Sequence, residues 1–350
     1  MAVALVAYAA LMADQRNTQI RLASRPAGEP TAANFEFTRE PLPVPGDGEV
    51  LLRTRYLSLD PYMRGRMSDA PSYAPPVEVG GIMVGGTVGE VVESNAPGFA
   101  PGDTVLAYTG WQEYGVARAK TLRKLDPGQA PVTTALGVLG MPGFTAYAGL
   151  TQIGRPQPGE TVVVAAATGP VGATVGQLAK ILGARAVGIA GGPQKTAYLS
   201  EIGFDAALDH RSPSFKQDLA KATPDGIDVY FENVGGHVWD AVFPRLNGFA
   251  RVPVCGLVAH YNEAAPPAGP DRAPALMTAV LKKSLTLRGF IQNEFAAELM
   301  PEFLAQATPW VRDGRIKYRE DIVDGLANTP EAFIGMLAGR NFGKLLIKVS

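Results

Sequence analysis

The first third of the chain alternates short apolar runs with turn residues. Between Ile20 and Lys124, runs such as EVLLRTRYLSL and DTVLAYTGWQEYGVA are separated by clusters rich in Pro and Gly. Apolar and polar positions that alternate over about 4–8 residues between such clusters are typical of antiparallel strands. The segment 85–107 shows this pattern on both sides of NAPG and predicts a hairpin. We therefore expect a compact β domain in this region.

The pattern changes at Glu160, where continuous apolar runs begin to alternate with helical segments. Buried-type strands are predicted at 161–167, 185–190, 206–210, 227–233, 250–255 and 284–291, followed by a long helix over 293–314. Strands that alternate with helices at this length indicate βαβ units and a parallel sheet. Residues 132–150 are predicted to be helical on each side of a Met-Pro-Gly break. After Arg315 the β pattern returns, so the C-terminus is expected to fold back onto the first domain.

Length, charge and cysteine content narrow the class of partner. The 350 residues suffice for two domains, and a net charge of −1 gives no basic surface for nucleic acid or an anionic membrane. Cys255 is the single cysteine, which excludes an intramolecular disulfide and fits a reducing cytoplasm. The apolar N-terminal run has no Lys or Arg before it, so we expect no signal peptide, and Met12 is an alternative start to Met1. A small-molecule partner is the expectation.

A glycine-rich stretch, AAATGPVGATVG, joins the first buried strand to a helix. It places Ala167, Gly169, Gly172 and Gly176 in an AxGxxG pattern followed by a further Gly. Such a turn lets the backbone approach a pyrophosphate at a helix N-terminus. The same glycines can instead serve close packing of helix against strand. Their place at the start of a βαβ series favours the nucleotide interpretation.

The segment after the second strand indicates which nucleotide. An NAD site normally presents an Asp or Glu there to the ribose hydroxyls. Here the sequence is GIAGGPQK, in which Gly191 and Gly192 leave room and Lys195 can pair with a 2′-phosphate. The missing acid favours NADPH over NADH more than the lysine does, because Lys195 alone is equally compatible with a solvated charge.

No zinc or covalent catalysis is indicated by the sequence. The histidines are His210, His237 and His260, and neither Cys nor His precedes Gly169, which excludes a catalytic zinc site in the β domain. Hydride transfer then needs hydrogen-bond donors where negative charge develops. Tyr261 follows the fifth strand, at the end where ligands collect, and Tyr62 lies in the turn LDPYMRGRM of the β domain. At both positions a packed tyrosine is the alternative.

These motifs resemble the medium-chain dehydrogenase/reductase superfamily, and within it the zinc-independent leukotriene B4 12-hydroxydehydrogenase/prostaglandin reductase group, with bacterial alkenal, alkenone and curcumin reductases. The resemblance is carried by YLSLDPYMRGRM, GMPGFTAY, AATGPVGATVGQLAK, GIAGGPQK, YFENVGG, VCGLVAHYN and RNFGKLLIKV, from about Met12 to Ser350. It implies an α/β protein with a GroES-like, β-rich catalytic domain over 1–135 and 315–350, and a Rossmann doubly wound parallel sheet over 136–314.

The resemblance also implies individual roles. Tyr261 and Tyr62 are expected to hydrogen-bond the substrate carbonyl or to assist protonation of the enolate. The cofactor contacts are expected at Gly169, Pro170, Val171 and Gly172 (pyrophosphate), Gly191 and Lys195 (2′-phosphate), Asn233, Cys255, Gly256, Tyr261, Asn262, Phe290, Ile291, Gln292, Asn341, Met141 and Thr145.

One segment departs from the group's pattern. Where these enzymes commonly have a tyrosine in a DY(K/R) segment after the third strand, this chain has Asp209-His210-Arg211. His210 or Arg211 can hydrogen-bond the 2′-phosphate in place of that tyrosine, and a histidine in an exposed loop is the alternative.

The expected activity is NADPH-dependent reduction of the carbon–carbon double bond of α,β-unsaturated ketones or aldehydes. Hydride transfer to the β-carbon needs no metal in this scheme. An NADPH:quinone reductase and a redox-inactive NADPH-binding protein are the alternatives. The resemblance further suggests a homodimer.

Overall fold

The computed structural model describes residues 16–263 and 269–350. These residues form two compact units. Unit 1 comprises the residues up to Leu136, with Glu320–Asn341 and Leu345–Ser350, and unit 2 comprises Gly137–Arg319 and Phe342–Lys344. The alternative start at Met12 lies outside the described residues.

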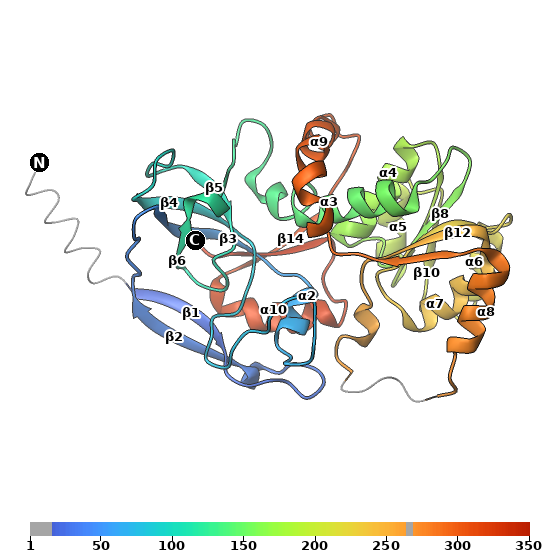
Figure 1. Cartoon of the computed structure of the whole chain (residues 1–350), viewed down its shortest axis with the longest axis horizontal. Coiled ribbons are helices and arrows are strands. Elements are labelled where there is room, and N and C mark those ends of the chain that lie inside the picture. Colours follow the sequence, from blue (N-terminus) through green and yellow to red (C-terminus); the bar gives the residue numbers. More distant parts are fainter. Residues whose placement is uncertain (1–15, 264–268) are drawn as a thin grey trace, which may run out of the picture. The chain divides into compact units, whose positions relative to one another are not determined.

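Unit 1 is built on antiparallel strands (Figure 1). A two-stranded sheet pairs β1 (Arg16–Leu22) with β2 (Phe35–Pro41). A seven-stranded sheet has the order β14-β15-β3-β4-β5-β7, with β6 paired to β3. Its strands are β3 (Glu49–Ser58), β4 (Thr87–Ser94), β5 (Thr104–Ala107), β6 (Tyr114–Arg118), β7 (Arg123–Lys124), β14 (Glu320–Asp324) and β15 (Lys344–Lys348). The hairpin predicted over 85–107 is confirmed, because β4 pairs antiparallel with β5.

An aromatic cluster fills the core of unit 1. Trp111 is fully buried and stacks on Phe35 with ring centroids 5.4 Å apart, while the Phe333 ring of α10 (Thr329–Leu337) meets it edge-on at 5.5 Å. Aromatic pairs in these geometries contribute about 0.5–1.5 kcal/mol each beyond the area they bury. Met63 of the short helix α2 (Tyr62–Arg66) belongs to the same core cluster. This packing anchors the helix that carries Tyr62.

Unit 2 contains a six-stranded parallel sheet in the order β10-β9-β8-β11-β12-β13 (Figure 1). The strands are β8 (Thr161–Val164), β9 (Arg185–Ala190), β10 (Ala206–Asp209), β11 (Ile227–Phe231), β12 (Leu246–Val254) and β13 (Thr286–Gly289). Each strand predicted in this half of the chain is present. The chain runs outward from β8 in one direction and then restarts beside β8 at β11, which makes the doubly wound order. Ligands bind at such a switch point, beyond the carboxyl ends of the strands.

Helices cover both faces of this sheet. On one face, α6 (Phe215–Ala222), α7 (Gly236–Val242) and α8 (Ala273–Lys283) share a core cluster with Val163, Val187 and Tyr230 of the strands. The crossovers on the other face are α4 (Pro170–Ile181) and α5 (Pro193–Glu201). The predicted long helix is confirmed as α9 (Asn293–Arg312).

The expected break at Met-Pro-Gly is wrong, because these residues begin helix α3 (Met141–Ala148). Pro142 lies in the first turn of the helix. Backbone N–H groups in that turn make no hydrogen bond within the helix, so proline loses nothing there by lacking one, and its fixed φ suits the helix. The interruption comes earlier, between the 3₁₀ turn Val132–Leu136 and the N-cap Gly140.

Candidate functional site

The glycine-rich turn leads from β8 into α4. The backbone is left-handed at Ala166, with φ of 50°, one residue before Ala167, the first position of the AxGxxG pattern. Ala167 is fully buried, and its N–H donates to the carbonyl of Ile189 at 2.9 Å. This bond ties the turn to the end of β9.

The physical reason for a glycine differs among positions 169, 172 and 176. A Cβ on Gly176 would lie 1.9 Å from the Phe204 ring, and one on Gly172 would lie 2.5 Å from the carbonyl oxygen of Ala166. Both positions therefore require glycine for packing. Gly169 has φ −70° and ψ 163°, which any residue adopts, and its Cβ would meet only the Ala166 oxygen at 3.3 Å. The fold therefore leaves more space at Gly169 than at Gly172 or Gly176.

A basic corner lies at the carboxyl ends of β9 and β10. A Cβ on Gly191 would lie 3.0 Å from Nε2 of His210 and 2.9 Å from Nε of Arg211, so these side chains surround the glycine. Lys195 is half-buried in the first turn of α5, which begins two residues earlier. The Asp209 carboxylate accepts the N–H groups of Gly192 at 3.0 Å and Arg211 at 2.9 Å. Those bonds lower the pKa of Asp209 and fix the loop.

Glu232 holds together two loops at the ends of β11 and β12. Its side chain is only 2% exposed, and its Oε1 accepts the N–H groups of Val234 at 2.7 Å and Gly235 at 2.9 Å. Its backbone carbonyl accepts the N–H groups of Cys255 at 2.9 Å and Gly256 at 3.2 Å. Burial raises the pKa of this carboxyl, although the hydrogen bonds that it accepts from the backbone N–H groups of Val234 and Gly235 oppose the shift. Both loops therefore depend on one buried residue.

The second loop places Tyr261. The 3₁₀ turn Val258–His260 is bound to the first loop, because Val258 N–H donates to the Asn233 carbonyl at 3.1 Å. The Asn233 side chain in turn donates to the Ala165 carbonyl at 2.9 Å, beside the glycine-rich turn. Tyr261 is half-buried, and its hydroxyl would lie 2.9 Å from a Cβ on Gly256. The Tyr261 hydroxyl thus faces the backbone just beyond the carboxyl end of β12.

The half-buried setting of Cys255 disfavours a nucleophilic role for its thiol. Burial, followed by the nearby charge of Glu232, raises the pKa of Cys255 to about 12. Since the thiolate is the reactive form, this raised pKa favours the unreactive thiol near neutral pH.

The other predicted cofactor residues of unit 2 differ in what they expose. Phe290 is 6% exposed, with its ring edge-on to Phe231 at 6.2 Å, so its side chain belongs to the core. Oε1 of Gln292 is buried and has no hydrogen-bond partner in the described structure. Thr145 donates its hydroxyl to the Met141 carbonyl at 2.8 Å within α3. Gln292 is the member of this group whose acceptor a ligand can satisfy.

Tyr62 and Asn341 belong to unit 1. Tyr62 begins α2, two residues after the buried Asp60, whose carboxylate accepts the hydroxyl of Ser58. Burial, and after it the charge of Asp60, raise the pKa of the Tyr62 hydroxyl well above its usual value. Tyr62 is therefore suited to donate a hydrogen bond and not to act as a phenolate.

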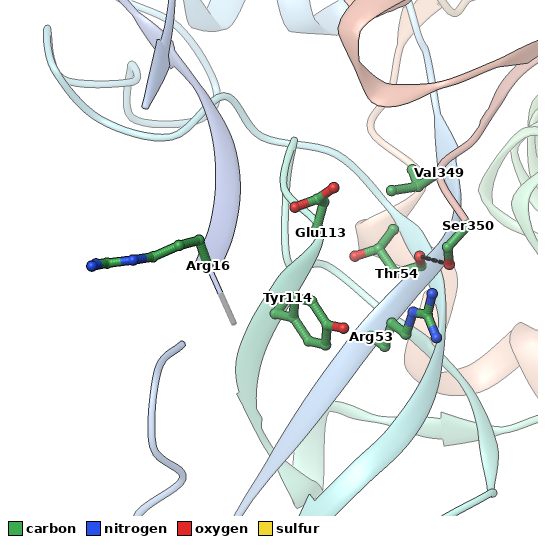
Figure 2. Close-up of a pocket in the computed structure, with 7 residues that line it drawn as sticks. All are labelled: Arg16, Arg53, Thr54, Glu113, Tyr114, Val349 and Ser350. Atoms are coloured by element: carbon green, nitrogen blue, oxygen red, sulfur yellow. Dashed lines mark hydrogen bonds between the residues drawn. The ribbon is translucent and has the colours of Figure 1, made fainter. Parts of the chain in front are cut away.

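Unit 1 also contains a cavity of about 220 Å³ (Figure 2). It is lined by Arg16, Arg53, Thr54, Glu113, Tyr114, Val349 and Ser350. The Ser350 hydroxyl donates to the Thr54 carbonyl at 2.9 Å, while the Arg16 side chain points away from the other lining residues. None of the residues predicted from the sequence lines this cavity.

Unit 2 thus contains most of the predicted site residues, at the ends of β8, β9, β10, β11 and β12. The sequence did not identify Glu232 or His237, whose Nε2 lies 3.0 Å from Nδ1 of His210. The signal for Glu232 was a carboxylate at the end of a buried strand, where burial requires compensating donors. Within the described ranges, no group of three or more His, Cys, Asp or Glu side chains is arranged to hold a metal ion. No helix there has both the length and the apolarity to span a membrane.

Family models and curated proteins match most of this chain. Residues 18–125 match the family described as the N-terminal domain of oxidoreductase, and residues 170–308 match zinc-binding dehydrogenase. The chain is 56% identical over 337 residues to NADPH-dependent curcumin reductase of Escherichia coli, covering 96% of this chain and 98% of that protein. It is 40% identical to prostaglandin reductase 1 of Rattus norvegicus, covering 92% and 95%.

A solved structure gives the same result. The crystal structure of CurA from Vibrio vulnificus in complex with NADPH is 52% identical, with a TM-score of 0.91 over 95% of this chain and 99% of that chain. The chain therefore belongs to the medium-chain dehydrogenase/reductase family, within the zinc-independent group that contains curcumin reductase and prostaglandin reductase 1.

Proposed function

We propose that this protein reduces the carbon–carbon double bond of α,β-unsaturated ketones and aldehydes with NADPH. The curcumin and prostaglandin reductases, at 56% and 40% identity over nearly the whole chain, support this activity. The observation that carries it is the arrangement at the switch point of the sheet. The glycine-rich turn after β8 and the basic corner after β9 and β10 lie on one side of that point, and the Tyr261 hydroxyl lies beyond β12 on the other.

The residues present fit NADPH on several grounds. Gly169 leaves room at a helix N-terminus for the pyrophosphate, and the nitrogens of His210 and Arg211 that lie beside Gly191 can hydrogen-bond the 2′-phosphate. The buried Oε1 of Gln292 offers an acceptor. We assign the nucleotide to the segments 141–145, 169–172, 191–195, 255–262 and 290–292, with His210, Asn233 and Asn341. Lys195 supplies positive charge beside the phosphate.

The chemistry divides between cofactor and protein. Bound NADPH supplies the hydride for the β-carbon of the substrate. The Tyr261 hydroxyl donates a hydrogen bond to the carbonyl oxygen and stabilises the negative charge that develops there as the enolate forms. Tyr62 stays protonated because its pKa is raised, and the resemblance to this group implies that it too acts as a hydrogen-bond donor. A proton from a tyrosine or from solvent then reaches the α-carbon and completes the saturated carbonyl compound.

We further propose the domain limits 1–135 with 315–350 for the catalytic domain and 136–314 for the nucleotide domain. A cytoplasmic homodimer is proposed as well. The exposed edge strand β13 and the exposed apolar residues Phe249 (74%), Met277 (65%) and Leu281 (81%) support association of two copies through unit 2. Light scattering tests this: a single-chain mass across micromolar concentrations would contradict the dimer.

Turnover with NADPH and a medium-chain enal or enone tests the function. We expect loss of nicotinamide absorbance and a product two mass units heavier with its carbonyl intact. Consumption of NADPH with quinones alone favours the quinone reductase, and binding without turnover of any acceptor favours the redox-inactive protein.

Tyr261→Phe tests the assigned donor. We expect kcat to fall by about 100–1000-fold, because removal of one oxyanion donor commonly has that effect. NADPH affinity is the control and should change little. Full turnover in the variant would show that the hydroxyl is not used.

A further inference from the structure

His210 and His237 form a directly bonded pair beside the proposed 2′-phosphate site. His210 follows β10, and His237 lies in the first turn of α7. The His210 Nδ1 and the His237 Nε2 are 3.0 Å apart, and the ring centroids are separated by 5.1 Å. His237 also contacts the Phe215 ring edge-on at 6.5 Å. These contacts fix the orientation of both imidazoles.

The pair directs the other nitrogen of His210 toward Gly191. Nε2 of His210 lies 3.0 Å from the position that a Cβ on Gly191 would occupy, next to Nε of Arg211. In a neutral imidazole one nitrogen is a donor and the other an acceptor. If His210 uses Nδ1–H toward His237, its Nε2 presents a lone pair toward Gly191, which repels a phosphate. A proton on Nε2 removes this conflict and adds a charge-assisted donor.

In the absence of a ligand, the surroundings of His210 disfavour protonation of its ring. Burial, then His237, Arg211 and Lys195 hold the pKa of His210 below its ordinary value, while Asp209 opposes them. The Asp209 carboxylate is engaged with two backbone N–H groups of the same loop. A dianionic phosphate at Gly191 adds two negative charges on the far side of the ring, and thereby favours the imidazolium.

We propose that the 2′-phosphate of NADPH is bound together with a proton on His210, and that His237 is a positioning residue that holds the His210 ring for this contact. NADPH binding then takes up a proton from solvent, whereas NADH binding does not. The inference rests on the proposed function, because it places the NADPH 2′-phosphate at Gly191. It makes the preference for NADPH over NADH dependent on pH.

Calorimetry of the full-length protein counts the protons. Titrations with NADPH and with NADH are run in two buffers of different ionisation enthalpy, above about pH 7.5, where the phosphate with its second pKa of about 6 is already a dianion. We expect net proton uptake with NADPH and none with NADH. Correspondingly, log Kd for NADPH should rise with pH by up to about one per pH unit, while log Kd for NADH stays flat.

Three variants separate the roles. His210→Gln should abolish the proton uptake and raise the NADPH Kd by about tenfold or more, the effect of losing one hydrogen bond to a charged group. His237→Leu should weaken NADPH but not NADH. His237→Gln should restore most of the loss, because its amide can still hydrogen-bond Nδ1 of His210. NADH binding reports intact folding in each variant. Because His237 is exposed, its substitution should leave the core packing unchanged.

The outcomes that overturn the proposal are distinct. Equal proton uptake with both nucleotides, or uptake that survives in His210→Gln, would show that His210 is not the group protonated. Equal loss of NADPH and NADH in both His237 variants would show a merely structural role for His237. If NADPH does not bind at all, the proposed function fails together with this inference.

Discussion

Gly169 and Gly176 lie seven residues apart on one turn and helix, yet they should respond differently to the same added methyl group. Gly176→Ala places a Cβ 1.9 Å from Cζ of Phe204 and 2.3 Å from Cε1, closer than any real contact. Gly169→Ala meets only the Ala166 oxygen, at 3.3 Å. The pair therefore separates a packing role from a ligand role.

The magnitudes follow from these contacts. Overpacking a filled core costs about 1–3 kcal/mol, and contacts as short as 1.9 Å place Gly176→Ala at the upper end of that range. Alanine in a helix interior returns about 1 kcal/mol relative to glycine, so this variant should lose about 2 kcal/mol of unfolding free energy. For Gly169→Ala, a loss of entropy in the unfolded chain stabilises by about 0.4–1 kcal/mol. A poorer N-cap offsets this gain by up to about 1 kcal/mol. Its unfolding free energy should therefore stay within about 1 kcal/mol of the parent.

Binding should show the opposite order. An Ala at 169 occupies the space that the pyrophosphate needs, so Kd should rise by about tenfold or more for NADPH and NADH alike, since both contain the pyrophosphate. Gly176→Ala should bind both nucleotides almost as the parent does. Urea unfolding monitored by far-UV circular dichroism gives the stabilities, and quenching of intrinsic fluorescence gives the dissociation constants.

Two results would refute this reasoning. Parent-like affinity in Gly169→Ala would mean that the pyrophosphate does not approach this turn. Parent-like stability in Gly176→Ala would mean that Phe204 moves aside at no cost, and that close packing does not explain the glycine.

Three smaller predictions concern individual side chains of unit 2. Because burial raises the pKa of Cys255 to about 12, iodoacetamide at neutral pH should leave the native thiol unmodified and alkylate it in urea; rapid native labelling by mass spectrometry would contradict this. Burial raises the pKa of Glu160, but its bonds to Arg251 and to the Gln157 N–H outweigh burial and hold that pKa below its usual range. The Glu160 carboxylate therefore stabilises the fold fully above its pKa in the unfolded chain, and this contribution is lost as pH falls through its pKa in the folded protein. Glu160→Gln should lower the unfolding free energy by about 1 kcal/mol at pH 7 and by less in acid. A deficit in urea midpoint that does not shrink with acid would refute it. Ala166→Gly should gain about 0.5–1 kcal/mol by relieving a left-handed φ; a lower melting temperature would oppose that expectation.

Much of the fold was predictable because hydrophobic periodicity records which faces are buried. The continuous apolar runs predicted every strand of the parallel sheet, since strands covered on both faces need no polar positions. The error at Met141-Pro142-Gly143 has a physical origin, because proline breaks a helix interior but suits its first turn. Sequence pattern alone does not show on which side of a proline the helix lies.

The site was predictable by segment but not by atom. Strand order brings Gly191, Asn233 and Cys255 to strand ends of one sheet, so their segments were identifiable. The contact between His210 and His237 joins positions 27 residues apart and depends on where α7 begins, which periodicity does not determine. Likewise, the left-handed residue of the glycine-rich turn is Ala166, and the AxGxxG pattern does not distinguish it from its neighbours.

Glu232 has a consequence for how this enzyme can be re-engineered. Loop exchange is a common route to new acceptor specificity, and the segment 255–262 around Tyr261 is the obvious piece to exchange. Yet this segment is hydrogen-bonded to the Glu232 and Asn233 carbonyls, and the Glu232 side chain shapes the neighbouring loop at Val234 and Gly235. A donor loop transplanted alone inherits partners adapted to another sequence. The exchangeable module is the two loops with their shared carboxylate, and acceptor preference should transfer between homologues only when both move together.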